Sequence, residues 1–364
     1  MPCGPCWSSA ADPTGTRVPA GALPGAPDAR SGWQSGPVQR WFDLSAVPRD
    51  HGPSAVTLGN FDGVHRGHQE VLAALVALAR ARGLPAVAVT FDPHPLAVLR
   101  PRSAPPALCS LEHRLELLEG CGPDAALVME FTTELAAWSP DHFVGRVLAD
   151  LLGARAVVVG RDTRFGHRNS GDVATLRELG HRYGFEVQEV LDLGDGDGPG
   201  PESRRWSSTW VRELVAAGEV GRAAEVLGRP HRVSGTVVHG DHRGRTLGFP
   251  TANLGPDAVG LVPADGVYAG RLLRRGPGRD PRGDGLPAAI SVGTNPTFDG
   301  KGRRVEAHVV GTDDLDLYGE VVDLDLVRRL RPMIRFSGVE ELVERMRQDV
   351  RECRAVLETA GRSG

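Results

Sequence analysis

The sequence predicts an α/β domain built on a parallel sheet, followed by a small antiparallel β-barrel and a last helix. In the first half, short apolar runs alternate with stretches of helical spacing, which is typical of a parallel sheet covered by helices on both faces. From residue 232 onward, short alternating runs between Gly, Pro and Asp turns indicate a small barrel. The 364 residues are enough for about two domains.

The expected elements of the first half follow from these periodicities. Five strands are expected, at Ser54–Leu58, Ala86–Phe91, Ala125–Met129, Ala156–Gly160 and Glu186–Val190. Four helices are expected between them, at His68–Arg82, Leu111–Gly120, Pro140–Leu152 and Val173–Tyr183. Ser139 before Pro140 is a typical helix N-cap with proline at the first helical position. A further helical stretch, Ser208–Leu227, is expected to break near Gly218.

The second half is predicted to form the barrel. Its strands are expected at Arg232–His239, Val267–Leu273, Leu286–Val292, Val305–Val310 and Glu320–Leu330. Ser337 and Glu340 form a capping box that opens a last helix, ending near Leu357. Arg274–Gly285 is interpreted as a solvated hairpin loop without a function. The predicted division is a disordered extension 1–37, an α/β domain 38–203, a helical linker 204–230 and a barrel domain 231–364.

Bulk properties exclude several classes of protein. The net charge of −4 leaves no basic footprint for nucleic acid. No apolar run approaches the roughly 18 residues that a membrane span needs. Five scattered cysteines suit a reducing cytoplasm, and Cys3-x-x-Cys6 has no second pair with which to bind a metal. The Pro-, Gly-, Ala- and Ser-rich extension lacks the apolar core of a signal peptide.

The lysine content restricts the possible phosphate chemistry. Lys301 is the only lysine in the chain. The Gly-Lys-Ser/Thr of a Walker A loop is therefore absent, as is the strand lysine of protein kinases. Any phosphoryl transfer here has to neutralise phosphates by other means.

The segment Gly59–His68 (GNFDGVHRGH) is the strongest candidate site. It joins a strand to a helix through a loop with three glycines, an arrangement that points backbone N–H groups at an anion. His65 and His68 can add donors or protons, and Gly67 between them permits close approach of a phosphate. The alternative is that both are loop histidines without a role. Asp62 is either a loop cap or a ligand.

Three other loops carry weaker signals. The segment Gly160–His167 (GRDTRFGH) follows an apolar strand, and the segment Thr90–Pro95 (TFDPHP) is either a rigid turn or a substrate contact. Ser207, Ser208 and Thr209 at a helix start, with Arg212 one turn on, can hold a polyphosphate. They equally suit an ordinary N-cap with a solvated arginine.

In the second half, Thr251 and Asn253 lie two apart in an extended segment and project to the same side. Their neutral oxygens can complete the shell of a magnesium ion that already holds nucleotide phosphates. Glu306 interrupts an apolar alternating strand and can take a proton from a hydroxyl nucleophile, or it is an ordinary outward-facing side chain.

Taken in order, these motifs resemble the bacterial bifunctional riboflavin kinase/FMN adenylyltransferase (FAD synthetase) family, from about Val38 to the C-terminus. GNFDGVHRGH, TFDPHP, GRDTRFGH and SSTWVR are similar to its adenylyltransferase motifs. GRTLGFPTANL, GVYAG, VGTNPTF, VEAHVV and LYG are similar to its riboflavin kinase module. The resemblance implies a Rossmann-like nucleotidyltransferase domain and a riboflavin kinase-like barrel in a cytoplasmic enzyme.

The resemblance also implies two reactions that use ATP and Mg²⁺. The barrel would phosphorylate riboflavin to FMN, with Glu306 activating the hydroxyl and Thr251 and Asn253 holding magnesium. The first domain would adenylylate FMN to FAD and release pyrophosphate, with His65 and His68 as its catalytic residues. Residues implied to bind ATP or its phosphates are Gly59, Phe61, Gly63, Gly67, Ser208, Thr209, Arg212, Gly248, Thr251 and Asn253. Residues implied to contact substrate are Asp92, His94, Asp162 and Arg335. The partners are small molecules, not nucleic acid or membrane, and the oligomeric state is open.

The chain departs from the family pattern at three places. Arg161-Asp162-Thr163 stands where an acid and an aromatic are usual, Trp210 where arginine is common, and Asn295 where an arginine precedes proline. The first two departures motivate an alternative, a riboflavin kinase with a weak or degenerate adenylyltransferase domain. Two further alternatives are a flavin-binding protein without turnover and an adenylyltransferase for another substrate.

Overall fold

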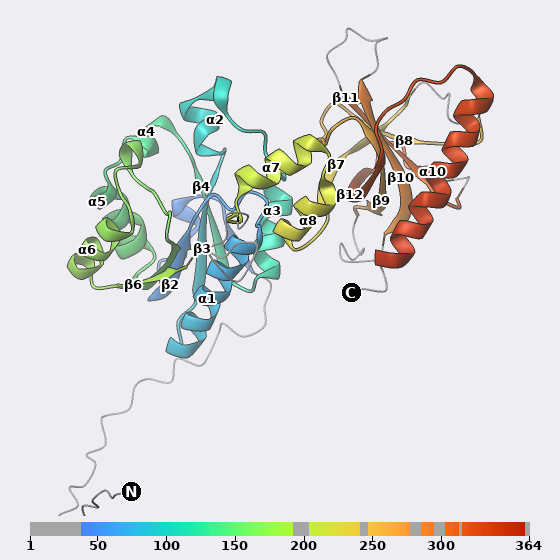
Figure 1. Cartoon of the computed structure of the whole chain (residues 1–364). Coiled ribbons are helices and arrows are strands. Elements are labelled where there is room, and N and C mark those ends of the chain that lie inside the picture. The colour runs from blue at the N-terminus through green and yellow to red at the C-terminus, as the bar shows by residue number, and fades with distance from the viewer. Residues whose placement is uncertain are drawn as a thin grey trace, which may run out of the picture. The chain divides into compact units, whose positions relative to one another are not determined.

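The computed structural model describes residues 38–191, 204–240, 247–276, 285–294, 303–312 and 315–360 (Figure 1). The predicted disordered extension 1–37 lies outside these ranges, together with Cys3, Cys6, Asn295 and Lys301.

A six-stranded parallel sheet forms the core of the first domain, in the order β1-β4-β3-β2-β5-β6. Its strands are β1 (Gln39–Trp41), β2 (Ser54–Leu58), β3 (Ala86–Asp92), β4 (Ala125–Glu130), β5 (Ala154–Gly160) and β6 (Glu186–Val190). The five predicted strands are confirmed. β1 was not predicted because three residues are too short to show an alternating pattern.

Helices cover the sheet (Figure 1). They are α1 (Arg66–Arg82), α2 (Pro95–Leu99), α3 (Leu111–Gly120), α4 (Thr133–Ala136), α5 (Pro140–Phe143), η3 (Val144–Leu151) and α6 (Val173–Tyr183). Ser139 caps α5 as predicted, accepting a hydrogen bond from the His142 N–H at 3.1 Å. The single helix predicted at Pro140–Leu152 is wrong in detail, because α5 is one turn and continues as the π-helical η3. The short α2 was not predicted.

The strand order places three candidate loops at one edge. β2 has β3 on one side and β5 on the other, so the chain reverses its direction of winding at β2. The loops that follow β2, β3 and β5 therefore leave neighbouring strands at their carboxyl ends. In open parallel sheets, ligands bind in the crevice that forms at such a switch point.

The predicted helical stretch after the first domain is confirmed as α7 (Ser208–Ala217) and α8 (Val220–Leu227). Gly218 separates them in the left-handed region, at φ 79°, where glycine is favoured. The two helices share an apolar core with Leu108, which belongs to the loop before α3. This segment is thus packed onto the first domain, and it is more than a linker.

The second half forms a closed antiparallel barrel in the order β10-β11-β8-β7-β12-β9. Its elements are β7 (His231–Val238), β8 (Ala252–Leu254), β9 (Gly266–Arg274), β10 (Leu286–Thr294), β11 (Arg303–Val309), β12 (Val321–Arg331) and α10 (Val339–Ala360). The five predicted strands and the final helix are confirmed, and β8 is an addition. Leu272, Ile290 and Leu324 are fully buried in its centre.

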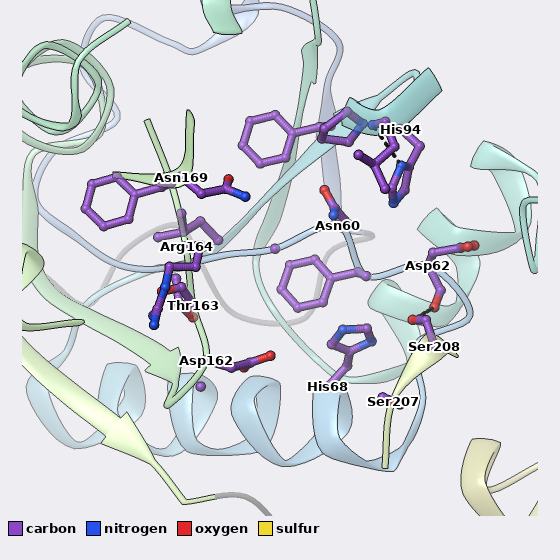
Figure 2. A pocket seen from close by; sticks show the side chains of 18 of the residues that line it. Asn60, Asp62, His68, His94, Asp162, Thr163, Arg164, Asn169, Ser207 and Ser208 are labelled. Atoms are coloured by element: carbon purple, nitrogen blue, oxygen red, sulfur yellow. Dashed lines mark hydrogen bonds between the residues drawn. The ribbon is translucent and has the colours of Figure 1, made fainter. Parts of the chain in front are cut away.

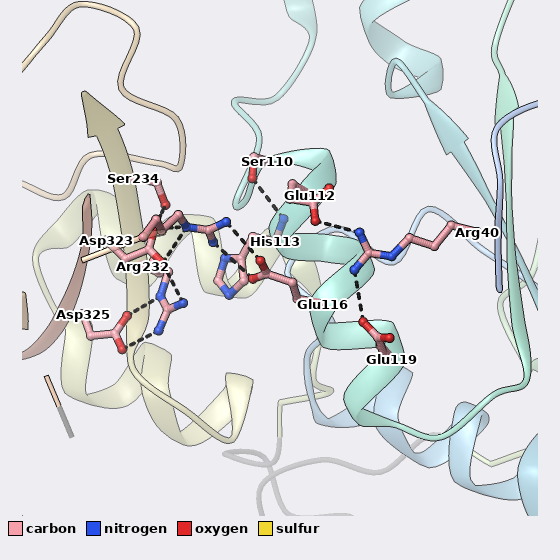
Figure 3. A network of polar contacts seen from close by, with 11 residues as sticks. Arg40, Ser110, Glu112, His113, Glu116, Glu119, Arg232, Ser234, Asp323 and Asp325 are labelled. Carbon is pink, nitrogen blue, oxygen red and sulfur yellow. Dashed lines mark hydrogen bonds and ion pairs between the residues drawn. The ribbon is translucent and has the colours of Figure 1, made fainter. Parts of the chain in front are cut away.

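Two details of the second half were predicted wrongly. Ser337 donates from its N–H and its hydroxyl to Glu341, at 3.0 and 2.6 Å, so the acid of the capping contact is not Glu340. Arg275, expected in a solvated loop, binds the carboxylate of Asp323 at 2.8 Å and that of Glu116 on α3 at 3.0 and 3.1 Å (Figure 3). Arg275 is therefore half-buried between two carboxylates from distant parts of the chain, not free in solvent.

Two buried histidines predict sensitivity to acid. Burial lowers the pKa of His113 on α3 to about 2, and nearby arginines add to the shift. Burial lowers the pKa of His231 to about 4, against the hydrogen bond to the Leu261 carbonyl, which raises it. Both side chains stay neutral in the fold between pH 6.5 and 4, whereas in the unfolded chain they take up protons. Stability is therefore lost as the pH falls through this window.

We expect the His113→Leu variant to lose less stability on acidification than the wild type. The difference in the fall of unfolding free energy between pH 7 and pH 5 should be about 2 kcal/mol, since one pKa unit corresponds to about 1.4 kcal/mol. Urea unfolding at the two pH values measures it. His181→Asn, at an exposed position of α6, serves as the control and should behave as wild type. An identical pH dependence in His113→Leu and wild type would contradict this account.

Candidate active sites

A cavity of about 1310 Å³ opens at the carboxyl edge of the sheet. The loops after β2, β3 and β5 line it, together with the segment that leads into α7. In Figure 2, His68 rises from α1 with Asp162 on one side of it and Ser208 on the other. Candidate residues that line the cavity are Gly59, Phe61, Asp62, His65, Gly67, His68, His94, Asp162, Ser208, Thr209 and Arg212.

The start of α1 lies at this cavity and has no side-chain cap. His65 is the N-cap residue of α1, but its side chain accepts no capping hydrogen bond. The loop before it is tightly curled, with positive φ at Phe61 (48°), Gly63 (78°) and Val64 (39°). An uncapped helix start combines unpaired N–H groups with the positive end of the helix dipole, which suits a phosphate.

His65 and His68 stack on each other with ring centroids 3.7 Å apart. Burial, reinforced by the charge of Arg205, lowers the pKa of His65 to about 4. Burial also lowers the pKa of His68 well below its usual value, with smaller contributions from His65 and Arg205. Both histidines are therefore neutral at pH 7, and the Nδ1 atom of each is buried without a hydrogen-bond partner in the described structure.

Gly67 has a local role beside the expected one. A Cβ atom at position 67 would lie 3.2 Å from the His65 ring. The absence of a side chain thus leaves space for the histidine stack. The predicted close approach of a phosphate stays a prediction.

Asp62 connects its own loop to the loop before α3 and to α7 by hydrogen bonds. Its carboxylate accepts hydrogen bonds from the Leu108 N–H at 3.0 and 3.1 Å and from Arg212 at 2.5 Å. Its backbone carbonyl accepts from the Ser208 hydroxyl at 2.8 Å. The sequence left open whether Asp62 is a loop cap or a ligand, and these contacts favour a structural role. The hydrogen bonds join separate segments, however, and do not close a local turn. They fix Ser208 and Arg212 at the wall of the cavity.

Arg205 is a lining residue that the sequence reasoning missed. It forms an ion pair with Asp162 at 2.6 Å, so the loop after β5 and the segment before α7 meet across the cavity. The pairing was not visible in the sequence because the partners are far apart along the chain. The sequence contained one indication of its role, namely that Arg205 lies two residues before the Ser207-Ser208-Thr209 run.

The departures at positions 161 and 210 lie away from the cavity. Arg161 is exposed and its nearest carboxylate is that of Glu189, 4.0 Å away. Trp210 is 5% exposed and packs in the core of α7 and α8. Neither side chain lines the cavity, so neither removes a phosphate contact from it.

The loop after β3 supplies the other end of the cavity. His94 caps α2 by accepting a hydrogen bond from the Leu96 N–H at 3.1 Å. Asp92 binds Arg114 at 2.8 Å and is not among the lining residues. Apolar side chains surround this end: Phe91, Leu96, Leu99, Phe131, Leu135 and Phe143. The cavity therefore has a polar end at α1 and an apolar end suited to a flat ring system.

The barrel brings its three candidate residues together. Asn253 on β8 is paired directly with Glu306 on β11, and residues opposite each other on antiparallel strands lie about 5 Å apart on one face. The Asn253 amide lies 3.4 Å from the Thr251 hydroxyl, which confirms that these two project to the same side. Val305, Ala307 and Val309 fill the barrel core, so Glu306 lies on the opposite face of β11.

Further contacts shape this second site. The Nδ1 atom of His308 lies 2.9 Å from the Pro250 carbonyl and so fixes the residue before Thr251. A Cβ at Gly240 would lie 2.5 Å from the Asn253 amide, so glycine leaves the space that Asn253 occupies. Gly248 has a φ of 82°, in the left-handed region. Arg335 is exposed between β12 and α10, and its role stays a prediction.

Two family models match the chain. The model described as FAD synthetase matches residues 47–203, and the model described as riboflavin kinase matches residues 227–357. A bifunctional riboflavin kinase/FMN adenylyltransferase from Escherichia coli K12 is 36% identical over 84% of this chain and 93% of its own length. The chain belongs to this family. The predicted fold class and family are thereby confirmed.

Other relatives match a similar share of this chain. The bifunctional riboflavin kinase/FMN adenylyltransferase of Listeria monocytogenes is 35% identical over 87% of this chain and 94% of its own length. A crystal structure titled as a macrolide-efflux protein from Streptococcus pneumoniae superimposes with a TM-score of 0.75 and 30% identity. The match covers 87% of this chain and 99% of that one. Within the described ranges, no helix has the length and apolar character needed to cross a bilayer.

Proposed function

We propose that this chain makes FMN from riboflavin and then FAD from FMN, using ATP in both steps. The observation that carries the proposal is that one chain holds two separate sites, whose candidate catalytic residues lie each within the matching family model. The α/β cavity with the two histidines belongs to the FAD synthetase match, and Thr251, Asn253 and Glu306 belong to the riboflavin kinase match. The alternative of a degenerate first domain loses part of its motivation, because Arg161 and Trp210 lie away from the cavity. Thr163, which stands where an aromatic is usual, does line it.

In the adenylyl transfer, a phosphate oxygen of FMN attacks the α-phosphorus of ATP. The bond from that phosphorus to the bridging oxygen breaks, and pyrophosphate leaves. The N–H groups at the start of α1 and the two histidines would face the developing negative charge. Because the phosphates are anionic, they would raise the pKa of His65 and His68 and favour proton donation to the transferring group.

The remaining residues of the first site would hold the ends of the two substrates. Ser208, Thr209 and Arg212 at the start of α7 would bind the leaving pyrophosphate, with Gly59, Phe61, Gly63 and Gly67 shaping the loop. The apolar end around Phe91 and Leu99 would receive the flavin ring, with His94 and Asp92 at its edge. Asp162 would contact substrate after exchanging its bond to Arg205.

In the kinase step, the 5′-hydroxyl of riboflavin attacks the γ-phosphorus of the other ATP, and ADP leaves. Glu306 would take the hydroxyl proton as general base. Gly248, Thr251 and Asn253 would contact the phosphates, and Arg335 the substrate. Because Asn253 lies opposite Glu306, a phosphate held by Asn253 would lie on the same face of the barrel as the general base, within reach of the hydroxyl that it activates.

Magnesium fits Thr251 and Asn253 only together with nucleotide phosphates. Both offer neutral oxygens, and the described residues include no cluster of three His, Cys, Asp or Glu side chains able to hold a metal. Mg²⁺ commonly takes few protein ligands and completes its shell with phosphates and water. When bound, Mg²⁺ would neutralise phosphate charge. The chain has two proposed ATP sites and a single lysine, Lys301, which cannot serve both. We also propose that the enzyme acts in the cytoplasm on small molecules alone.

The test is to incubate the purified chain with riboflavin, ATP and Mg²⁺ and to separate the flavins by chromatography. FMN should appear first and FAD later, and a chelator in excess of Mg²⁺ should stop both. If neither flavin nucleotide forms, the proposal is wrong. If FMN accumulates and supplied FMN is not converted to FAD, only the adenylyltransferase half is wrong.

A further inference from the structure

The phosphate-binding loop of the first domain needs outside support. Phe61 and Val64 have positive φ, and a non-glycine residue there costs on the order of 1–3 kcal/mol. Within the loop the Phe61 carbonyl accepts from the Val64 N–H at 3.1 Å, whereas the Gly63 and Val64 carbonyls accept from side chains outside it. Any carbonyl that turned toward the cavity would place a partial negative charge beside the phosphates of ATP.

Arg229 donates hydrogen bonds to the carbonyls of this loop. Its guanidinium donates to the Gly63 carbonyl at 2.6 Å, to the Val64 carbonyl at 3.3 Å and to the Leu227 carbonyl at 3.1 Å. Gln69 on α1 supports the same point, donating to the Val64 carbonyl at 2.9 Å and the Leu227 carbonyl at 2.8 Å. These donors thus join the loop, the first turns of α1 and the end of α8, and neither Arg229 nor Gln69 lines the cavity.

The chemistry of Arg229 is unusual for a buried arginine. Burial lowers its pKa to about 10, so it is still charged at neutral pH. In the described part of the chain, its hydrogen bonds go to carbonyl oxygens and none to a carboxylate. Withdrawing most of this charge from water is costly. The hydrogen bonds to three carbonyls and the attraction of the Asp325 carboxylate offset part of that cost, while the Nε atom has no hydrogen-bond partner among the described residues. The position of Arg229 therefore serves hydrogen bonds to the loop carbonyls and not a direct ion pair.

We propose that Arg229 is a positioning residue for adenylyl transfer. It holds the carbonyls of Gly63 and Val64 away from the cavity, so that the N–H groups at the start of α1 and the two histidines face ATP. Arg229 lies within residues 227–357, which the riboflavin kinase model matches, and beyond the FAD synthetase match at 47–203. A residue in the kinase part of the sequence thus serves the other active site. This inference rests on the proposed function of the first domain.

The test uses the full chain, in which the kinase reports on folding. Arg229→Met keeps the bulk of the side chain and removes its donors. We expect kcat/KM for FAD formation from supplied FMN and ATP to fall about 100-fold, as misplacement of a reacting group by about 1 Å can produce. Phosphorylation of riboflavin by the same preparation should stay at the wild-type level. Arg222→Met changes an exposed arginine of α8 that pairs with Glu219, and it should leave both activities unchanged.

A second variant separates positioning from stability. In Arg229→Ala, millimolar guanidinium should restore part of the FAD formation, whereas ammonium, which cannot bridge two carbonyls in the same way, should restore less. The inference is wrong if Arg229→Met forms FAD as fast as the wild type. It is also wrong if both activities fall together and guanidinium restores neither. A wild-type chain that makes no FAD from FMN would instead refute the proposed function itself.

Discussion

Replacing Glu306 with glutamine should reduce riboflavin phosphorylation by about 10²- to 10⁴-fold, the range that a general base contributes. The amide keeps the shape of the side chain and its place opposite Asn253, but it cannot take the proton of the 5′-hydroxyl. The fall should appear in kcat more than in the KM for ATP, because Thr251 and Asn253 remain. FAD formation from supplied FMN should be unchanged.

Chromatography of the flavins formed from riboflavin measures this effect, and the same preparation tested with FMN controls for folding. Glu340→Gln, at an exposed position at the start of α10, is the matched control and should keep both activities. Wild-type phosphorylation by Glu306→Gln would mean that another group takes the proton.

Replacing His68 with alanine should reduce FAD formation from FMN by about 10²- to 10³-fold, the effect of losing one donor to the transition state. His68 lines the cavity between Asp162 and Ser208 (Figure 2), and its buried Nδ1 has no hydrogen-bond partner among the described residues. The variant also removes the stacking partner of His65. Riboflavin phosphorylation should not change, because Glu306, Thr251 and Asn253 are intact.

Pyrophosphate release with FMN and ATP measures the loss. His181→Ala removes an exposed histidine of α6 and is the matched control, expected to keep wild-type rates. If His68→Ala released pyrophosphate at the wild-type rate, the histidine pair would have no part in the transfer.

Regular elements with strong periodicity could be predicted from the sequence. β2, β6, α3 and α6 have the predicted bounds, since their apolar spacing and capping residues are local signals. β1 and β8 were not predicted as strands, because three-residue strands gain their hydrogen bonds from distant partners. The π-helical form of η3 could not be predicted either, because the spacing of its apolar residues fits an ordinary α-helix equally well.

The candidate sites were predictable as loops and residue types, but their contacts were not. The sequence indicated Asp62 and Arg212 separately, and only the fold shows that they bind each other. The concerns about Arg161 and Trp210 assumed that both faced the substrate, which is a question of side-chain direction in three dimensions. Arg205 and Arg229 owe their importance to partners far along the chain, Asp162 and Gly63.

The central claim is that one chain carries two separate ATP-dependent sites that act in sequence. Mixing Glu306→Gln with His68→Ala tests it most directly, with riboflavin, ATP and Mg²⁺ as the only substrates. Neither variant alone should make FAD efficiently from riboflavin. The mixture should, because the second variant makes FMN and the first converts it. If the mixture accumulates FMN without forming FAD, the two sites do not act independently and the claim is contradicted.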